Sequence, residues 1–277
     1  MVSYAKEVEQ GQRFEFGKNW QRFLGVLNED RIVEAEKSLR TMLEAESLSG
    51  KSFLDVGSGS GLFSLAAMRL GAARVHSFDY DPQSVACTKE LKRRYFPDAH
   101  HWTIEEGSVL DPAYLAALGQ FDIVYSWGVL HHTGKMWQAL ENVALLVNSR
   151  GRLYIALYND QGGKSLRWRT VKSLYNRGKP WRLLVISIFV PYFVLGGLAV
   201  DIVRWKNPLR RYRDYKKSRG MSVVHDWVDW LGGYPFEFAK PEQIFDFYRK
   251  RSFSLVKLKT CGGGLGNNEF VFQKCAG

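Results

Sequence analysis

The order of apolar segments between residues 52 and 157 constrains the fold more than any other feature of this chain. Short apolar runs that suit buried strands alternate five times with stretches whose apolar residues recur at helical spacing. This alternation is typical of βαβ units, which build a parallel sheet with helices on both faces. The expected strands cover 52–56, 74–78, 102–104, 121–126 and 152–157, and the expected helices cover 29–45, 62–70, 82–95 and 136–147, with a short helix beginning at Asp111-Pro112.

The alternation stops at Tyr158 and resumes near residue 240. A helix over 241–250 and strands over 252–259 and 269–273 are expected, with four glycines between the two strands, as in a hairpin. The chain therefore predicts one doubly wound α/β domain with a large insertion after its fifth strand. The expected parts are an N-terminal helical lid (1–50), the core (51–158), a cap insertion (159–239) and a C-terminal helix and hairpin that complete the core (240–277).

A glycine-rich loop, Gly57-Ser58-Gly59-Ser60-Gly61, follows the first expected strand. Glycine permits both a sharp turn into a helix and the close approach of a ligand to the backbone. Asp55 before this turn would repel a pyrophosphate but attract a cationic amino-acid ligand. Asp79 ends the second expected strand, where a carboxylate accepts hydrogen bonds from ribose hydroxyls.

Four motifs follow one another in a fixed order: Asp55-x-Gly57-x-Gly59-x-Gly61, then Phe78–Asp81, Glu106–Asp111 and Phe121–His132. Together they resemble the class I S-adenosylmethionine (SAM)-dependent methyltransferases. The resemblance implies a Rossmann-like, seven-stranded sheet with an antiparallel last hairpin. It also implies SAM as the cofactor and S-adenosylhomocysteine (SAH) as the product.

The resemblance assigns roles to single residues over 50–158, and more loosely over 240–273. Where many relatives carry an aspartate beside the adenine, this chain has Ser108, a weaker acceptor. For Tyr80 and Trp127, simple core packing is the alternative role. The implied cofactor residues are Asp55, Gly57, Ser58, Gly59 and Gly61 at the methionine and ribose, Asp79 at the ribose, Tyr80, Ser108 and Val109 at the adenine, and Trp127 near the sulfonium.

His131 and His132 follow the fourth expected strand and are the candidate catalytic residues. A neutral imidazole suits proton removal from an acceptor hydroxyl near pH 7. The alternative is that the pair only shapes its loop, and His225-Asp226 is a second candidate base. Three dispersed cysteines and the remaining histidines form no ligand set, so no metal site is expected.

The cap insertion is basic and contains a long apolar stretch. Residues 164–220 hold 15 Lys and Arg but only two acidic residues, and residues 183–200 carry no charge. A transmembrane helix would separate 221–277 from the sheet that they complete, and Pro191 and Gly196-Gly197 would interrupt it. We therefore expect a broken helix or helical hairpin at a membrane surface. A buried cap helix, a dimer contact and RNA binding are the alternatives.

These observations predict a SAM-dependent methyltransferase of a small, lipophilic acceptor such as a quinol, phenol or lipid-like molecule. The motifs resemble the ubiquinone- and menaquinone-type enzymes. The alternatives are a saccharide, amine or RNA acceptor, or a membrane-associated SAM-binding protein without transfer activity. The few cysteines favour a reducing, cytoplasmic location, peripheral on the membrane through 181–219, with the oligomeric state open. Residues 14–20 are expected to form a lid with Lys18 at the cofactor carboxylate, or else a plain amphipathic lead-in. The acceptor pocket is expected to be lined by Trp227, Trp230, Tyr234, Phe236 and Phe238, with a rigid turn over 229–235 as the alternative.

Overall fold

A seven-stranded mixed sheet organises the protein, in a computed structural model that describes residues 4–203 and 230–276. The strand order is β3-β2-β1-β4-β5-β7-β6, and only β7 runs antiparallel to its two neighbours. The predicted fold class is therefore confirmed. The strands are β1 (Ser52–Val56), β2 (Arg74–Asp79), β3 (Trp102–Glu106), β4 (Phe121–Trp127), β5 (Val147–Tyr158), β6 (Phe253–Lys259) and β7 (Asn267–Lys274).

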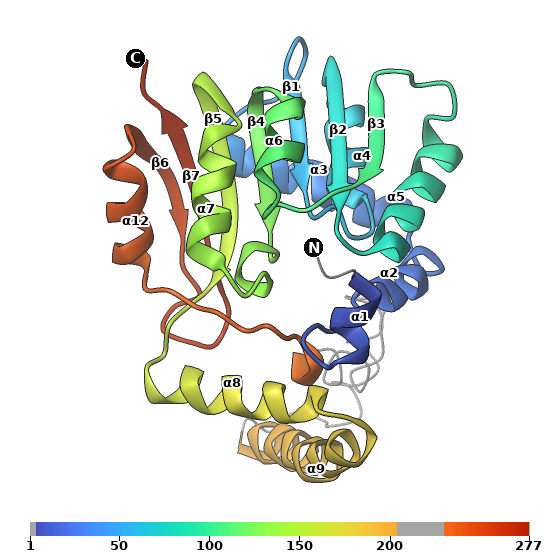
Figure 1. The fold of residues 1–277 in the computed structure, drawn as a ribbon, viewed down its shortest axis with the longest axis vertical. Helices are drawn as coiled ribbons and strands as arrows, with labels where there is room; N and C mark the ends of the chain where they lie inside the picture. Colours follow the sequence, from blue (N-terminus) through green and yellow to red (C-terminus); the bar gives the residue numbers. More distant parts are fainter. Residues whose placement is uncertain (1–3, 204–229, 277) are drawn as a thin grey trace.

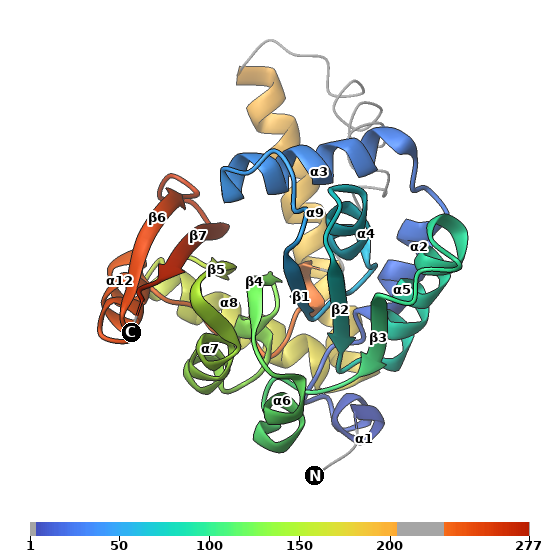
Figure 2. The ribbon, with the colours of Figure 1, turned by 90° about the horizontal axis from the view of Figure 1, so that it is seen from above.

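Helices cover both faces of the sheet and enclose two cores (Figures 1 and 2). Because both faces are buried, successive residues of one strand enter opposite cores: Phe53 packs with one set of helices, and Leu54 with the other. One face carries α3 (Glu29–Leu43), α4 (Leu62–Arg69) and α5 (Pro82–Tyr95), and the other carries α6 (Pro112–Leu118), α7 (Met136–Leu145) and α12 (Pro241–Arg249).

Local signals explain where several helices begin. Asp81 and Asp111 each accept a hydrogen bond from a backbone N–H of the first turn, and each precedes a proline that suits that turn. The fifth strand is expected to start at residue 152, but β5 starts five residues earlier, at Val147, which pairs with Phe121 of β4. The sequence pattern misses this start because residues 148–151 are polar or glycine.

Two segments lie against the carboxyl ends of the parallel strands. The N-terminal helices α1 (Tyr4–Glu9) and α2 (Gly17–Leu24) lie below β1–β3 in Figure 1. The cap helices α8 (Gly163–Asn176) and α9 (Lys179–Val203) form a helical hairpin at the bottom of the same view.

The expected interruption of the apolar cap segment is wrong, because α9 runs unbroken through Pro191 and Gly196-Gly197. A proline inside a helix frees the carbonyl four residues earlier. Here that residue, Ser187, is exposed, so water can satisfy the freed group. The expected hairpin within 183–200 is also wrong, because α9 is continuous there, and a hairpin is formed instead by the whole of α9 with α8.

Candidate active site

The glycine loop has a backbone that only glycine adopts without strain. Gly57, Gly59 and Gly61 all have positive φ angles, of 77°, 56° and 79°. A Cβ atom on Gly57 would lie 2.4 Å from the Val129 side chain, and one on Gly61 would lie 2.8 Å from that of Thr88. The backbone N–H of Gly57 donates to the carbonyl of Phe78, which ties the loop to the end of β2.

Asp79 lies at the end of β2 and contacts the glycine loop directly. One of its carboxylate oxygens accepts from the Gly59 N–H at 2.9 Å, and the other accepts from the Asp81 N–H at 2.9 Å. Burial raises the pKa of Asp79 to about 6, although these two hydrogen bonds oppose the shift. A carboxylate offers about four acceptor positions, so acceptor capacity remains for a ligand's hydroxyls.

Asp55 lies beneath the loop rather than on its open side. It is buried and accepts a hydrogen bond from the Ser64 hydroxyl of α4 at 2.5 Å. Burial raises its pKa to about 7. Ser58 is also buried, and its hydroxyl lies 3.0 Å from that of Thr88. These two side chains therefore support the loop from behind.

The remaining predicted cofactor residues differ in exposure. Trp127 is 42% exposed at the end of β4, whereas Val109 is buried in the core that contains α7. The Ser108 hydroxyl accepts from the Leu110 N–H at 3.2 Å, within the turn that precedes α6. Tyr80 packs edge-on against Tyr4 of α1, with ring centroids 5.5 Å apart.

The N-terminal segment covers the glycine loop, as expected of a lid. The Tyr4 hydroxyl and the Gly17 N–H both donate to Asp81, at 2.6 and 2.7 Å. Trp20 of α2 lies against Gly59, where an added Cβ atom would approach its ring to 3.0 Å. Lys18, however, is exposed and pairs with Glu15 at 2.7 Å. No periodic pattern of apolar residues predicted α1 or α2.

The two histidines occupy different hydrogen-bonding positions in the 3-10 turn η1 (Leu130–His132). His131 is fully buried, its Nδ1 accepts from the Tyr158 N–H at 3.3 Å, and its Nε2 has no hydrogen-bond partner among residues 4–203 and 230–276. His132 Nδ1 lies 2.5 Å from the Pro235 carbonyl, so Nδ1 carries the proton and Nε2 keeps its lone pair. Burial lowers the pKa of His131 well below its usual value and that of His132 to about 3.

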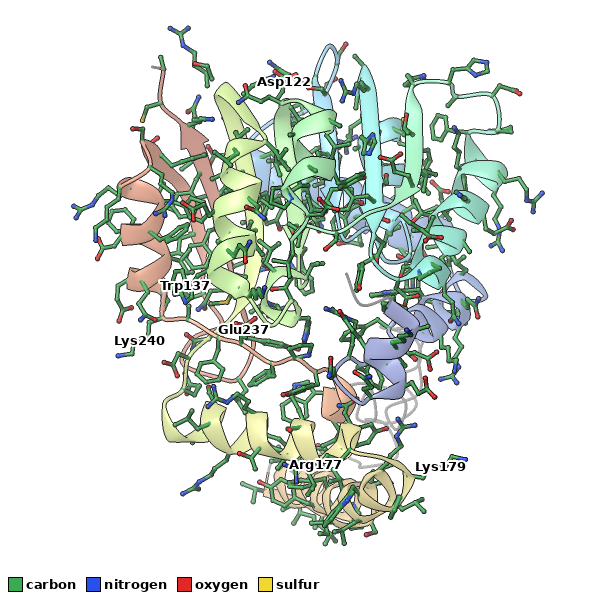
Figure 3. All side chains as sticks on the ribbon, in the orientation of Figure 1. Asp122, Trp137, Arg177, Lys179, Glu237 and Lys240 are labelled. Carbon is green, nitrogen blue, oxygen red and sulfur yellow. The ribbon has the colours of Figure 1, made fainter. Side chains whose placement is uncertain are left out.

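The last residues of the cap insertion pack over η1. The Glu237 N–H donates to the His131 carbonyl at 3.0 Å, and its carboxylate accepts from the Met136 N–H at 3.0 Å. In Figure 3, Glu237 lies on the segment between the sheet and α8. Phe236, a predicted pocket residue, packs against Tyr158 with ring centroids 4.9 Å apart. Among the other predicted candidates, Trp227 and His225-Asp226 lie outside the described residues.

Sequence reasoning missed Lys172, which points inward from α8 beside Phe236. Its Nζ lies 4.9 Å from the Phe236 ring centroid, and the side chain is fully buried. A signal was available, because Lys172 shares a helical face with the apolar residues Trp168 and Tyr175.

The cap also contains an open, mostly aromatic pocket between α8 and α9, with a volume of about 740 Å³. Lys164 and Arg167 contribute basic side chains, and Leu265 comes from the β6–β7 connection. Of the predicted acceptor residues, Trp230 lines this pocket. Its lining residues are Lys164, Arg167, Trp168, Val171, Phe189, Tyr192, Phe193, Trp230 and Leu265. Within residues 4–203 and 230–276, no three His, Cys, Asp or Glu side chains gather as a metal site would require.

Comparison with known proteins gives a match for the central part of the chain. Residues 54–153 match the family model of a methyltransferase domain. A ribosomal protein L11 methyltransferase of Methylococcus capsulatus is 52% identical over 52 residues, which cover 19% of this chain and 18% of that relative. The chain therefore matches less than a fifth of this relative's length.

Solved structures share the fold at low sequence identity. Magnesium protoporphyrin IX methyltransferase from Synechocystis PCC 6803, solved with bound SAH, superposes with a TM-score of 0.54 at 14% identity, over 93% of this chain and 94% of that one. A SAM-dependent methyltransferase from Mesorhizobium loti gives 0.51 at 13% identity, over 87% and 98% of the two chains. Residues 54–153 thus match a methyltransferase domain, and the chain shares the fold of solved SAM-dependent methyltransferases.

Proposed function

We propose that the protein transfers the methyl group of SAM to a small, lipophilic acceptor such as a quinol, a phenol or a lipid-like molecule. The cofactor half of this proposal is supported by the positive-φ glycine loop with Asp79 beside it. The sulfonium methyl is intrinsically reactive, so the protein mainly has to hold the acceptor in line with the carbon–sulfur bond. Such positioning supplies roughly 7–11 kcal/mol of a reaction barrier.

The single observation that carries the acceptor class is the aromatic pocket between α8 and α9. Its walls are mostly aromatic and aliphatic, as in sites that bind apolar ligands, and its volume of about 740 Å³ suits a molecule with a hydrocarbon tail. The pocket lies at the carboxyl side of the sheet, where doubly wound folds bind their ligands. This arrangement favours the ubiquinone- and menaquinone-type enzymes that the motifs resemble.

Helix α9 supports a membrane surface as the source of such an acceptor. Among the described residues it is the one helix long and apolar enough to cross a bilayer, and 6% of its most apolar window is buried. Leu184, Ile188 and Leu195 are 45–64% exposed along its length. At its start, Lys179 and Trp181 are exposed, which suits the headgroup region. Since β7, after the cap, pairs with β5, we propose that α9 lies on the membrane and does not cross it.

For an acceptor hydroxyl that still carries its proton, His132 is the better candidate base of the pair. Its Nε2 lone pair is available, whereas His131 presents a protonated Nε2 because its Nδ1 accepts a backbone N–H. Opening of the cap would rehydrate His132 and raise its pKa toward the usual range.

A protein acceptor is the second candidate, because the curated relatives include ribosomal protein L11 methyltransferases. The match of 52 residues is too short to include both the glycine loop and the cap. It therefore bears on the cofactor domain more than on the acceptor.

Transfer of a radiolabelled methyl group from SAM tests the proposal. We expect label in organic extracts when the protein acts on a quinol and phenol panel presented in vesicles. Label in ribosomal protein or RNA fractions instead would contradict the lipophilic acceptor, and SAM binding without any transfer would leave only a SAM-binding protein.

Vesicle flotation tests the membrane contact separately. We expect binding to phosphatidylglycerol vesicles that weakens at high salt, and loss of binding when Leu184 and Ile188 are both replaced by Lys. Replacing Leu145, a 65% exposed residue on α7, by Lys is the matched control and should leave binding unchanged. Equal binding by the wild type and the double variant would refute the role of α9.

A further inference from the structure

Lys172 is a basic residue of the cap helix α8, and its side chain is fully buried. It donates a hydrogen bond to the Trp230 carbonyl, and its Nζ lies 4.5 Å from the Trp230 ring centroid and 4.9 Å from that of Phe236. Within the described part of the chain, no carboxylate lies within 4.0 Å of it.

Burying a lysine ammonium destabilises the folded protein unless an anion, such as a bound ligand, interacts with it. Burial disfavours the ammonium form and lowers the pKa of Lys172 to about 7. The two aromatic faces favour a cation, but they compensate only part of the lost hydration. A methionine of similar length would fill the same space without this cost. The structure thus places an amine that is about half protonated at pH 7 where packing alone does not require an ionisable group.

The described groups in contact with Lys172 are aromatic rings and a backbone carbonyl, and none of them is an anion. His131 and His132 are close enough for the lysine charge to lower the pKa of both rings. Among the described residues, the buried His131 Nε2–H has no acceptor. A negatively charged ligand oxygen could therefore accept hydrogen bonds from Lys172 and from His131.

Trp230 connects this place with the aromatic pocket of the cap. Its ring lines the pocket and also contacts the Lys172 ammonium. A ligand whose tail fills the pocket would therefore place its head group beside the residue that contacts Lys172.

We propose that Lys172 binds an ionised oxygen of the methyl acceptor, so that the substrate is a lipophilic acid, either a phenolate or a carboxylate. This inference rests on the proposed function and specifies the charge of its acceptor. Lys172 acts as a substrate-binding residue that selects the anion and holds it beside the histidine pair.

The chemistry of the transfer agrees with an ionised acceptor. An oxygen lone pair forms the new carbon–oxygen bond, the carbon–sulfur bond breaks, and its electron pair stays on sulfur as the neutral thioether of SAH. No proton has to leave the acceptor, so no strong base is needed. The product is a neutral ether or ester that loses its attraction to Lys172, which favours release.

A lipophilic nitrophenol tests the proposal, because its ionised form absorbs visible light. We expect 2-nitro-4-octylphenol to bind the wild-type protein as the phenolate, in the presence of SAH. Replacing Lys172 by Met or Gln should weaken this binding about 10- to 100-fold, the value of a charge-assisted hydrogen bond, and should shift the bound probe toward its neutral form. Lys172→Arg should keep most of the binding.

Competition identifies the acid. Displacement by octanoate and not by a phenol favours a carboxylate substrate, and the reverse favours a phenolate; both results support the proposal. Equal competition by octanol, or an unchanged probe spectrum in Lys172→Gln, would overturn it. Lys37→Met, an exposed lysine of α3, is the control and should bind like the wild type.

Two further measurements distinguish loss of acceptor binding from loss of stability and from loss of cofactor binding. Lys172→Met should melt no lower than the wild type, because it removes a buried charge. SAH binding by calorimetry reports on the cofactor site alone. Probe binding without methyl transfer would refute the proposed function but leave the Lys172 site standing.

Discussion

Replacing Asp79 by Ala tests the cofactor site most directly. Its carboxylate oxygens already accept the N–H groups of Gly59 and Asp81, each at 2.9 Å, and they retain capacity for two ribose hydroxyls. A hydrogen bond to a charged group is worth about 1.5–3 kcal/mol. We expect the variant to lose about 2 kcal/mol of SAM binding, which is about a 30-fold rise in Kd.

The same carboxylate makes SAM binding depend on pH. Burial raises the pKa of Asp79 to about 6 in the free protein, and only the ionised form accepts from both hydroxyls. Below pH 6 the site must first lose a proton, so affinity falls as pH falls. Between pH 7 and pH 5 the wild-type Kd should rise about 10-fold from this group. Asp79→Ala should lack this rise.

Isothermal titration calorimetry with SAM and SAH at pH 5, 6 and 7 provides the measurement. Asp98→Asn, an exposed site in the loop after α5, is the control and should bind like the wild type. Thermal melts exclude unfolding of the Asp79 variant. An unchanged Kd in Asp79→Ala, or a wild-type Kd that is independent of pH, would refute the assignment of Asp79 to the ribose.

Three further outcomes are expected. Asp55→Asn should change the pH dependence of stability: burial raises the Asp55 pKa to about 7, so the contribution of this group to the wild-type Tm falls as pH rises from 4 to 7, and the variant lacks that contribution; equal slopes of Tm against pH in both proteins would contradict this. Gly57→Ala should lose at least about 1–3 kcal/mol in denaturant unfolding because of its positive φ, and the added Val129→Ala should restore part of the loss; no rescue would show that contact with Val129 is unimportant. His132→Asn should slow methylation of neutral alcohols more than of ionised acceptors, and equal loss for both would exclude a base role.

The sheet and its helices could be predicted from local sequence alone. Strand β1 and helix α5 have the expected bounds, because an apolar run and a capped, proline-started helix are signals carried within a few residues. The glycine loop was equally visible, since its positive φ angles demand glycine wherever the chain folds this way.

The sequence could not show how the parts around that loop face one another. Helix α2 packs partly on the glycine loop and Asp81, and its Leu24 and Trp20 pack on the core that contains α5. Helix α9 passes through Pro191 because exposure supplies water for the freed carbonyl, a fact that no local pattern contains.

The sequence by itself determined the fold, the cofactor loop and the position of Asp79, because each depends on residues close together in the chain. Only the tertiary structure turned Asp55 inward to Ser64, gave the two histidines different free nitrogens, and buried Lys172 between two aromatic rings. Those properties come from desolvation and from contacts that form only in the folded chain, and the contacts of His132 and Lys172 also require the cap insertion to pack.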